Sequence, residues 1–395
     1  MPQYVITPKL WLKKIFSFID SLLGYTIKII DYRKPFDNTK GVILTEPVKL
    51  TGLNPKYKIE TGEKPYWLNI FKEGIQLHSF VYYILPDSFL IGRGIILNEK
   101  KELILESTIF QREYLNKLIK NHLILRTKFS AVTQKLPPVI PLLNRLSNNY
   151  YHWTTEQLAR LAILVSKTDI DLNQYHIAIT KNAPGFVKES LIMLFNIREE
   201  KIIEWQDNEV AKTEESLLIS YHFIRNPQTR MTNIYHPDIY FFLNKIADES
   251  IDEEDGEYTY LILSRKNSNQ RMLFGEDKIA ESFPEFPFKV ITLEDMPFVQ
   301  QLQLFRKAKI IIGSHGAGFV NLIYCKHNAI VIEIFPATRK IRDSALFYQI
   351  TSAKNLKHHL IIQPAINNRQ DMEVDSTLIE KITSIINKHV KAVQD

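Results

Sequence analysis

The chain of 395 residues contains one cysteine, Cys325, and only 13 glycines. A single cysteine excludes an intrachain disulfide and a cysteine-based zinc site, and it favours a reducing compartment such as the cytoplasm. We expect Cys325 to be a buried apolar residue, as most free cysteines are. Few glycines and 18 prolines argue against long disordered tracts. The length and a hydrophobic share of 45% suit a globular protein of two or more domains.

Dense runs of one charge are also missing. The formal net charge is +6, which suits an anionic substrate or an anionic membrane surface. There is no zinc-finger spacing and no Lys/Arg run with interleaved aromatic residues, so we expect no nucleic-acid partner.

The N-terminal region lacks an uninterrupted hydrophobic run. Lys13, Lys14, Asp20 and Lys28 interrupt the apolar segment 11–34, so it is too polar to span a bilayer, and no small-residue cleavage site follows it. Its apolar residues follow helical spacing and predict an amphipathic helix. Two interpretations stay open: a helix packed on the body of the protein, which we favour, and peripheral contact with the inner membrane.

Strand and helix patterns alternate along most of the remaining chain. Residues 79–106 are β-branched and predict two or three antiparallel strands, with turns at Pro86-Asp87 and Asn98-Glu99. Further strands are predicted at 175–180, 201–205 and 216–221, and helices at 150–165, 184–195 and 378–393. Alternating strands and helices indicate a parallel sheet covered by helices, hence an α/β fold. We divide the chain into an N-terminal extension (1–60), an α/β domain (61–235) and a second α/β domain with a C-terminal helix (236–395).

The most informative segment is 310–335, IIIGSHGAGFVNLIYCKHNAIVIEIF. It predicts a strand, a glycine loop, a short helix at 319–324 and a second strand at 330–335. A loop that opens onto a helix N-terminus presents unpaired N–H groups and partial positive charge, which suit a phosphate. His315 adds a titratable group, so we expect a nucleotide here. The spacing matches neither a Walker A loop nor GxGxxG, and a tight turn is the alternative.

A second cluster lies at residues 148–161, NNYYHWTTEQLARL. His152 and Glu156 are four residues apart and share a helix face, with Arg160 one turn further. An imidazole oriented by a carboxylate is suited to act as a general base for an acceptor hydroxyl. It follows a strand, at the edge where open α/β sheets bind ligands. A buried structural histidine is the alternative.

Two further features involve charge. The loop LSRKNSNQR at 263–271 follows a strand and contains Arg265 and Arg271, and arginine binds a diphosphate bidentately. Glu333 lies in the apolar strand VIEIF, where a carboxylate is costly unless it is hydrogen-bonded. Ribose hydroxyls and nearby backbone groups are equally open as the hydrogen-bond partners of this carboxylate.

No pair of acidic residues has a spacing that indicates a metal site. We therefore expect a site without metal, built from Arg, Lys and loop N–H groups.

These segments together resemble glycosyltransferase family 61, which includes bacterial capsular-polysaccharide biosynthesis proteins. GSHGAGFVNLIYCKHNAIVIEIF resembles the family's C-terminal signature. NYYHWTTEQLARL resembles its Tyr-x-His-Trp-x-x-Asp-x-Leu-Pro-Arg-Leu motif, and LSRKNSNQR its Ser-Arg…Arg segment. The similarity covers about 80–360. The chain departs from the family pattern at Glu156 (usually Asp), Ala159 (Pro), Gln300 (Glu) and Phe319 (Leu).

The resemblance implies a GT-B-like architecture of two Rossmann-like domains that face each other across a cleft, with a β-rich N-terminal portion. It implies inverting, metal-independent transfer of a hexose or pentose from a nucleotide-sugar, most simply a UDP-sugar, to a glycan or lipid-linked acceptor. His152 and Glu156 would be the catalytic residues on the acceptor side. The donor-binding residues would be Arg265, Arg271, Gly313, Ser314, His315, Gly316, Ala317, Gly318, Asn321 and Glu333.

Two alternatives remain. One is a nucleotide-sugar epimerase or hydrolase, which needs no acceptor pocket. The other is a non-catalytic glycan-binding or scaffold protein of a polysaccharide assembly complex.

Overall fold

The computed structural model describes the chain in segments, which we specify here by number. They are residues 29–30, 41–45, 48–50, 56–60, 65–77, 79–108, 132, 134–221, 223–224, 233–251, 257–326 and 328–394. The predicted N-terminal amphipathic helix and most of the acidic run at 251–257 lie outside these residues. Within them, no helix combines the length and the apolar character needed to cross a membrane.

A six-stranded sheet forms the centre of the N-terminal half, in the order β13-β12-β11-β15-β6-β2. The strands from β13 to β15 run parallel, and β6 and β2 add an antiparallel edge. Their bounds are β13 (Ile202–Trp205), β12 (His176–Thr180), β11 (Val139–Pro141), β15 (Glu215–Ile219), β6 (Val81–Pro86) and β2 (Gly41–Ile43). The predicted strands at 175–180, 201–205 and 216–221 are therefore confirmed.

A second sheet, in the order β1-β9-β8-β7-β14-β10, contains most of the β-rich segment 79–106. Its strands are β1 (Ile29–Ile30), β9 (Leu103–Ile104), β8 (Ile95–Leu97), β7 (Phe89–Ile91), β14 (Val210–Thr213) and β10 (Gln134–Leu136). β7, β8 and β9 pair antiparallel in succession, as predicted, whereas β6 leaves at Pro86 and pairs with β15 in the first sheet. The alternation of residue types located these strands, but it does not specify which distant strand each one pairs with.

The C-terminal sheet is parallel throughout, in the order β20-β18-β21-β22-β23-β4. Its strands are β20 (Phe288–Ile291), β18 (Thr259–Leu263), β21 (Ala308–Ser314), β22 (Ile330–Pro336), β23 (Lys357–Gln363) and β4 (Tyr57–Ile59). β21 and β22 are almost entirely buried, which explains their continuous β-branched sequences. β4 comes from the segment we predicted to be an N-terminal extension, and it completes the edge beside β23.

Three strand pairs stand apart from the large sheets. They are β16 (Phe223–Ile224) with β17 (Ile234–Tyr235), β19 (Leu273–Phe274) with β24 (Met372–Glu373), and β3 (Val48–Leu50) with β5 (Ile75–Leu77).

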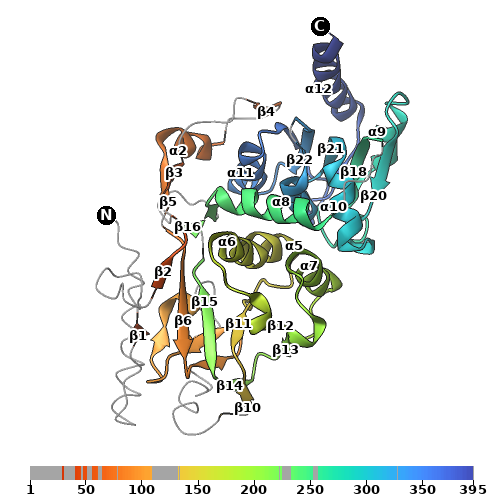
Figure 1. The fold of residues 1–395 in the computed structure, drawn as a ribbon. Coiled ribbons are helices and arrows are strands. Elements are labelled where there is room, and N and C mark those ends of the chain that lie inside the picture. Colours follow the sequence, from red (N-terminus) through yellow and green to blue (C-terminus); the bar gives the residue numbers. More distant parts are fainter. Residues whose placement is uncertain are drawn as a thin grey trace.

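Helices lie between the first sheet and the C-terminal sheet, with α8 along the boundary (Figure 1). The α-helices are α2 (Trp67–Glu73), α5 (Tyr150–His152), α6 (Ala159–Lys167), α7 (Gly185–Phe195), α8 (Asp238–Ser250), α9 (Glu276–Glu281), α10 (Phe298–Arg306), α11 (Ala345–Ala353) and α12 (Ser376–Gln394). A π-helix, Trp153–Leu158, joins α5 to α6. The 3₁₀ helices are η2 (Leu105–Thr108), η4 (Leu172–Gln174), η5 (Glu199–Lys201), η6 (Leu293–Asp295), η7 (Ala317–Tyr324) and η8 (Ile341–Ser344). The helices predicted at 150–165, 184–195 and 378–393 are confirmed.

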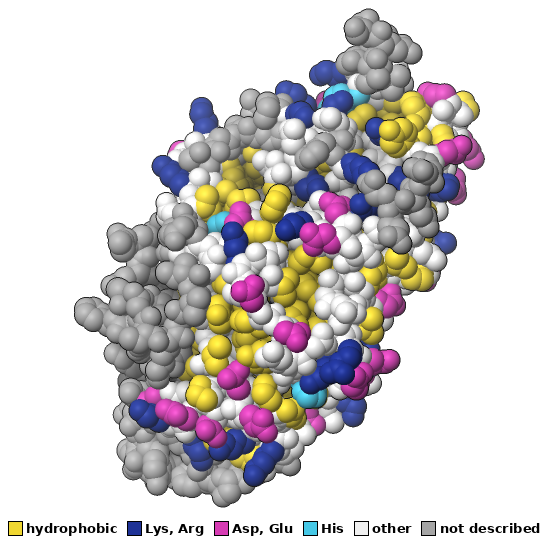
Figure 2. Space-filling view, in the orientation of Figure 1, with side chains coloured by type: hydrophobic (Ala, Val, Ile, Leu, Met, Phe, Trp, Pro, Cys, Tyr) yellow, Lys and Arg dark blue, Asp and Glu magenta, His cyan; other side chains and the backbone are white. Residues whose placement is uncertain are grey.

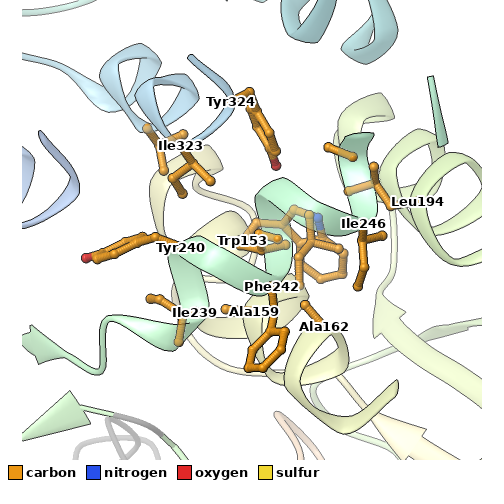
Figure 3. Close-up of a cluster of buried hydrophobic side chains, with 14 of the residues drawn as sticks. Trp153, Ala159, Ala162, Leu194, Ile239, Tyr240, Phe242, Ile246, Ile323 and Tyr324 are labelled. Atoms are coloured by element: carbon orange, nitrogen blue, oxygen red, sulfur yellow. The ribbon is translucent and has the colours of Figure 1, made fainter. Parts of the chain in front are cut away.

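The largest hydrophobic cluster joins the two halves. Trp153 and Ala162 contribute from the N-terminal half, Phe242 from α8, and Ile323 and Tyr324 from η7 (Figure 3). The indole N–H of Trp153 is also satisfied, because it donates to Ser190 Oγ at 2.9 Å. On the face in Figure 2, apolar side chains gather near the middle and charged side chains surround them. The α/β class is confirmed, and a GT-B arrangement of two facing domains stays a prediction.

Candidate functional site

A cavity of about 580 Å³ opens at the carboxyl ends of β18 and β21. The chain passes from β18 to β20 on one side and then returns to β21 on the other, so the cavity lies where the strand order reverses. Open α/β sheets bind ligands at this position. The lining residues are Tyr150, Pro184, Gly185, Phe186, Glu189, Leu263, Ser264, Arg265, Leu293, Glu294, Asp295, Met296, Pro297, Gln301, Ser314, Gly316, Ala317, Gly318 and Phe319.

Position 316 requires glycine because the side chain of Arg265 lies close to its backbone. A Cβ built at this position would overlap Nη1 of Arg265. The φ angle of Gly316 is −172°, which any residue adopts, so its role is to leave room for the guanidinium. On its other side, Arg265 donates to Ser268 Oγ at 2.7 Å and to the carbonyl of Gln270 at 3.1 Å. The glycine loop and the basic loop, which are distant in sequence, therefore form one wall of the cavity.

The start of η7 adds hydrogen-bond donors to this wall. The first N–H groups of a helix have no partner within the helix, and here they belong to the Ala317–Gly318 turn that lines the cavity. Ser314 is 2% exposed, and its Oγ has no hydrogen-bond partner among the described residues. The predicted order of strand, glycine loop and helix is thus present, although the helix is 3₁₀ and Gly313 and Ser314 belong to the strand.

Three guanidinium groups converge beside the glycine loop. Burial lowers the pKa of Arg271, and the charges of Arg339 and Arg265 lower it further. The Nε atoms of Arg271 and Arg339 are buried without a hydrogen-bond partner in the described part of the chain. Arg339 pairs with Asp343 at 2.9 Å, and the charges of Glu294, Asp371 and Glu276 act on Arg265, so carboxylates offset part of the positive charge. Such a cluster is suited to bind an anionic ligand.

His315 lies next to this cluster but is almost fully buried. Its Nδ1 is 2.5 Å from Oε1 of Glu333, and Oε2 of Glu333 is 3.0 Å from Nε2 of His358. Burial lowers the pKa of His315 to about 4, although the Glu333 contact opposes the shift. Both oxygens of Glu333 are therefore occupied inside the protein, and Glu333 supports His315 from beneath the cavity.

Asn321 connects the two halves of the chain. Its Oδ1 accepts a 2.5 Å hydrogen bond from the hydroxyl of Tyr150, and its Nδ2 donates to Gln301 Oε1 at 3.0 Å. Gln301 in turn donates to the carbonyls of Leu293 and Met296. Asn321 is fully buried, so it holds two cavity-lining residues, Tyr150 and Gln301, in place.

The structure brings His152 and Glu156 together, as predicted. His152 Nδ1 is 2.7 Å from Glu156 Oε1, and the exposed fractions of the two side chains are 24% and 0%. Glu156 also accepts hydrogen bonds from Asn233 and the hydroxyl of Tyr235, both at 3.1 Å, and from Asn144 at 3.3 Å. Glu156 is therefore buried and held by four side chains, whereas His152 is partly exposed and has a second ring nitrogen besides the one that contacts Glu156.

The local sequence explains this arrangement. Asn149 caps α5, because its side chain accepts from the N–H groups of Tyr151 and His152. Glu156 lies in a π-helical turn, a feature often found at functional sites. Arg160 does not pair with the Glu156 carboxylate as its spacing suggested. It donates instead to the main-chain carbonyls of Glu156 and Ile219.

The predicted residues occupy two neighbouring places rather than one. Arg265, Ser314 and the Gly316–Gly318 turn line the cavity, as does Tyr150 of α5. The other predicted donor-binding residues are not among the lining residues; they are Arg271, Gly313, His315, Asn321 and Glu333. His152 and Glu156 are not among the cavity-lining residues. Glu156 instead contacts Asn144, which follows β11, and Asn233, which precedes β17. Sequence reasoning missed Tyr150, Arg339, His358, Asn233 and Tyr235. Tyr150 lies inside a motif that we had singled out, while the others carry no local signal.

No group of three or more potential metal-ligating residues occurs among the described residues. The sequence contains one Asp-x-Asp tripeptide, Asp169–Asp171. Asp171 caps η4 by accepting from Asn173 N–H, before β12 and hence at the opposite end of the sheet from His152.

The fold and the cavity place the chain among α/β proteins that have a cavity at the carboxyl edge of a parallel sheet. Residues 150–332 match the family model described as Glycosyltransferase 61. This match, over a little under half of the chain, confirms the resemblance to the family for these residues. The matched residues include both halves of the site, from Tyr150 to β22.

Curated relatives are glycosyltransferases of eukaryotes. A rice beta-1,2-xylosyltransferase, XAX1, is 24% identical over 217 residues, which are 51% of this chain and 37% of that protein. Mouse protein O-linked-mannose beta-1,4-N-acetylglucosaminyltransferase 2 is 29% identical over 79 residues, 20% of this chain and 14% of that protein. The Drosophila melanogaster EGF domain-specific O-linked N-acetylglucosamine transferase is 29% identical over 75 residues, 18% of this chain and 14% of that protein. The chain thus spans less than two fifths of the length of each of these relatives, and a bacterial, capsular setting stays a prediction.

Proposed function

We propose that this protein transfers a hexose or pentose from a nucleotide-sugar to a glycan or lipid-linked acceptor, with inversion and without a metal. The observation that carries the proposal is the cavity at the sheet's reversal point, with Arg265 packed on Gly316 in its wall. The family match and the named relatives support a sugar-transfer reaction.

The donor would occupy the cavity with its diphosphate at the glycine loop. The N–H groups of η7, Ser314 and the guanidinium of Arg265 supply donors to phosphate oxygens. The rings of Tyr150 and Phe186, whose centroids are 5.0 Å apart, offer an apolar surface to a base. Arg271 and Arg339 would stabilise the charge that develops on the leaving diphosphate, which is usually the largest contribution in such catalysis.

His152 would be the general base, and Glu156 would position it. The acceptor hydroxyl gives its proton to the outward nitrogen of His152, and its oxygen forms a bond to the anomeric carbon. The bond between that carbon and the diphosphate oxygen breaks on the opposite face, so the configuration inverts. Glu156 keeps the imidazole oriented and stabilises its protonated form, as a carboxylate does behind a catalytic histidine.

Release of nucleotide from a UDP-sugar, measured with and without a mixture of glycan acceptors, tests this proposal. A transferase releases UDP at a rate that depends on the acceptor and extends the glycan. Acceptor-independent release indicates a hydrolase, and a changed sugar with UDP still attached indicates an epimerase. Glycan binding without nucleotide binding or release would support the scaffold alternative and contradict the transfer reaction.

A further inference from the structure

A second cavity, of about 340 Å³, opens at the same edge of the C-terminal sheet as the cavity beside Gly316. It lies at the carboxyl ends of β22 and β23, where Phe335 and Ile362 line it, and Pro65 and Tyr66, which follow β4, complete its wall. Its volume is in the range of small-molecule sites. We refer to it as the second cavity and to the one beside Gly316 as the first cavity.

The walls of the second cavity are almost entirely apolar. Phe335 is a buried member of one hydrophobic cluster, and Ile341 and Ile362 pack against that cluster. Tyr66 is 43% exposed, and its neighbour Trp67 fixes the wall, because its indole N–H donates to the carbonyl of Ile341 at 3.2 Å. No carboxylate or amide side chain occurs among the described residues that line this cavity, although such groups are well suited to bind sugar hydroxyls. The walls therefore suit a hydrocarbon better than a glycan.

Arg339 carries the one charge among the described residues that line the second cavity. Its Nη2 contacts Asp343 at 2.9 Å, and its Nε is buried without a hydrogen-bond partner in the described part of the chain. The Nε of Arg271 is buried without such a partner as well. Buried N–H groups are almost always paired in proteins, so these two donors indicate that a hydrogen-bond acceptor binds here.

The charges of the two arginines favour an anion as that acceptor. Burial lowers the pKa of Arg271 to about 9, and the charges of Arg339 and Arg265 act in the same direction. Asp343 opposes the shift with a smaller effect than either arginine. An anion that contacts both Arg271 and Arg339 would relieve their repulsion, and guanidinium groups bind phosphate bidentately.

We propose that the second cavity binds the hydrocarbon chain of a lipid phosphate whose phosphate contacts Arg339 and Arg271. In the reaction this ligand is the acceptor, a sugar joined through phosphate to an apolar chain, rather than a free glycan. The acceptor role rests on the proposed function, which left both acceptor classes open. The charge of Arg339 acts on Arg265, so it reaches the first cavity through space while its N–H groups contact the acceptor.

Calorimetric titration of the full chain with farnesyl phosphate, below its micelle concentration, tests the site. Ala337→Asp is the sharpest variant, because Ala337 is exposed, follows the end of β22 and lines the second cavity. A carboxylate there repels phosphate and disfavours a hydrocarbon neighbour. We expect Ala337→Asp and Arg339→Gln each to weaken farnesyl phosphate binding at least tenfold. The matched control is Arg342→Gln, which removes another arginine that pairs with Asp343 but does not line this cavity.

Simpler probes separate the two parts of the ligand. Inorganic phosphate lacks the chain and farnesol lacks the charge, so each should bind at least tenfold more weakly than farnesyl phosphate. UDP should not displace farnesyl phosphate, because UDP is expected in the first cavity. The proposal is overturned if farnesyl phosphate does not bind, if UDP displaces it, or if Ala337→Asp binds it as tightly as wild type. Phosphatidylglycerol vesicles that displace it would indicate contact with a membrane surface and would exclude a discrete acceptor site.

The acceptor role has its own readout. UDP release from UDP-N-acetylglucosamine or UDP-xylose is measured with N-acetylglucosamine joined by diphosphate to a farnesyl chain, and with free N-acetylglucosamine. The KM for the linked sugar should be at least tenfold lower, and the difference should disappear in Ala337→Asp. Equal KM values, or no transfer to the linked sugar while the UDP-sugar binds, overturn the acceptor role and leave the donor side of the proposed function intact. If neither UDP-sugar binds, the proposed function fails, and the farnesyl phosphate result stands or falls alone.

Discussion

Tyr150 of α5 and Asn321 of η7 are joined by a 2.5 Å hydrogen bond that links the two halves of the chain beside the cavity. Tyr150 belongs to the motif of the N-terminal half and Asn321 to the signature that follows the glycine loop. The contact therefore joins the start of α5 to η7, beside the wall of the proposed donor site. It links two segments that are about 170 residues apart in the sequence.

Removal of this hydroxyl should cost stability without changing the packing. Tyr150→Phe leaves the buried Oδ1 of Asn321 without its donor, which typically costs about 1–3 kcal/mol. Urea denaturation measures the loss. Tyr258→Phe is the matched control, because Tyr258 is 61% exposed and should change the free energy of unfolding by less than about 0.5 kcal/mol. Equal effects of the two variants would contradict a structural role for the contact.

A methyl group at Gly316 should disturb Arg265 rather than the backbone. The Cβ of Gly316→Ala would overlap the guanidinium, which must move away from the cavity wall. We expect UDP affinity to fall about tenfold or more, comparable with Arg265→Ala, since a charge-assisted hydrogen bond contributes about 1.5–3 kcal/mol. Calorimetric titration of the single and double variants checks this. If the two losses add in full in the double variant, Gly316 does not act through Arg265.

His152 and Glu156 should respond differently to substitution. His152→Ala removes the proposed base and should lower kcat by about 10²–10⁴ with little change in UDP affinity. Glu156→Gln leaves the imidazole in place but removes the carboxylate that orients it, so kcat should fall less than in His152→Ala. Steady-state rates of sugar transfer between pH 5 and 9 measure both. Full activity in His152→Ala would exclude it as the base.

Burial raises the pKa of the Glu333 carboxyl, and this predicts a pH dependence of stability. Its folded pKa is raised above the ordinary value near 4.5, so the unfolded chain releases a proton that the folded chain keeps. The stability that Glu333 contributes is complete below pH 4.5 and is lost as the pH rises through its folded pKa, by up to about 1.4 kcal/mol per pH unit. Glu333→Gln removes this loss, so its stability relative to wild type should increase with pH. The measurement is urea denaturation of both proteins over this pH range. If the free energy of unfolding depends on pH in the same way in both, the raised pKa of Glu333 is contradicted.

The buried histidines predict the opposite trend at acidic pH. His315 and His358 have folded pKa values of about 4 and about 3, below the ordinary 6.5, so the unfolded chain binds protons first on acidification. Stability should fall as the pH decreases from 6.5 toward 4, with both rings contributing. Thermal unfolding of Glu333→Gln over this range isolates the histidine contribution, and a flat profile would contradict it.

The local sequence pattern was sufficient to predict most of the strands and helices near the site. The apolar run before Gly313 and the run that contains Glu333 specified β21 and β22, because strands buried on both faces must be continuously apolar. The helix predicted at 184–195 begins after Pro184, whose fixed φ suits a helix start, and the structure adds that Asn149 caps α5. The spacing of His152 and Glu156 placed both on one turn, and the structure confirms their contact.

Long-range pairing limited the remaining predictions. Nothing near Tyr57 indicates that β4 completes the C-terminal sheet, because that pairing depends on His358 about 300 residues later. Arg339 follows β22, and His358 lies in β23. Only the parallel register of the strands brings these two residues to Glu333 and His315. The role of Gly316 was likewise hidden, since the group that requires it, Arg265, belongs to another loop.

The central claim is that the cavity beside Gly316 binds a nucleotide-sugar without a metal. Thermal unfolding with UDP, GDP and CDP, each with EDTA and with Mg²⁺, in wild type and Arg265→Ala, tests it most directly. A nucleotide at 100 times its dissociation constant stabilises the fold by about 2.7 kcal/mol. The account predicts a shift for one nucleotide, with UDP expected, that persists in EDTA and disappears in Arg265→Ala. A shift that requires Mg²⁺, or that survives the loss of Arg265, would contradict it.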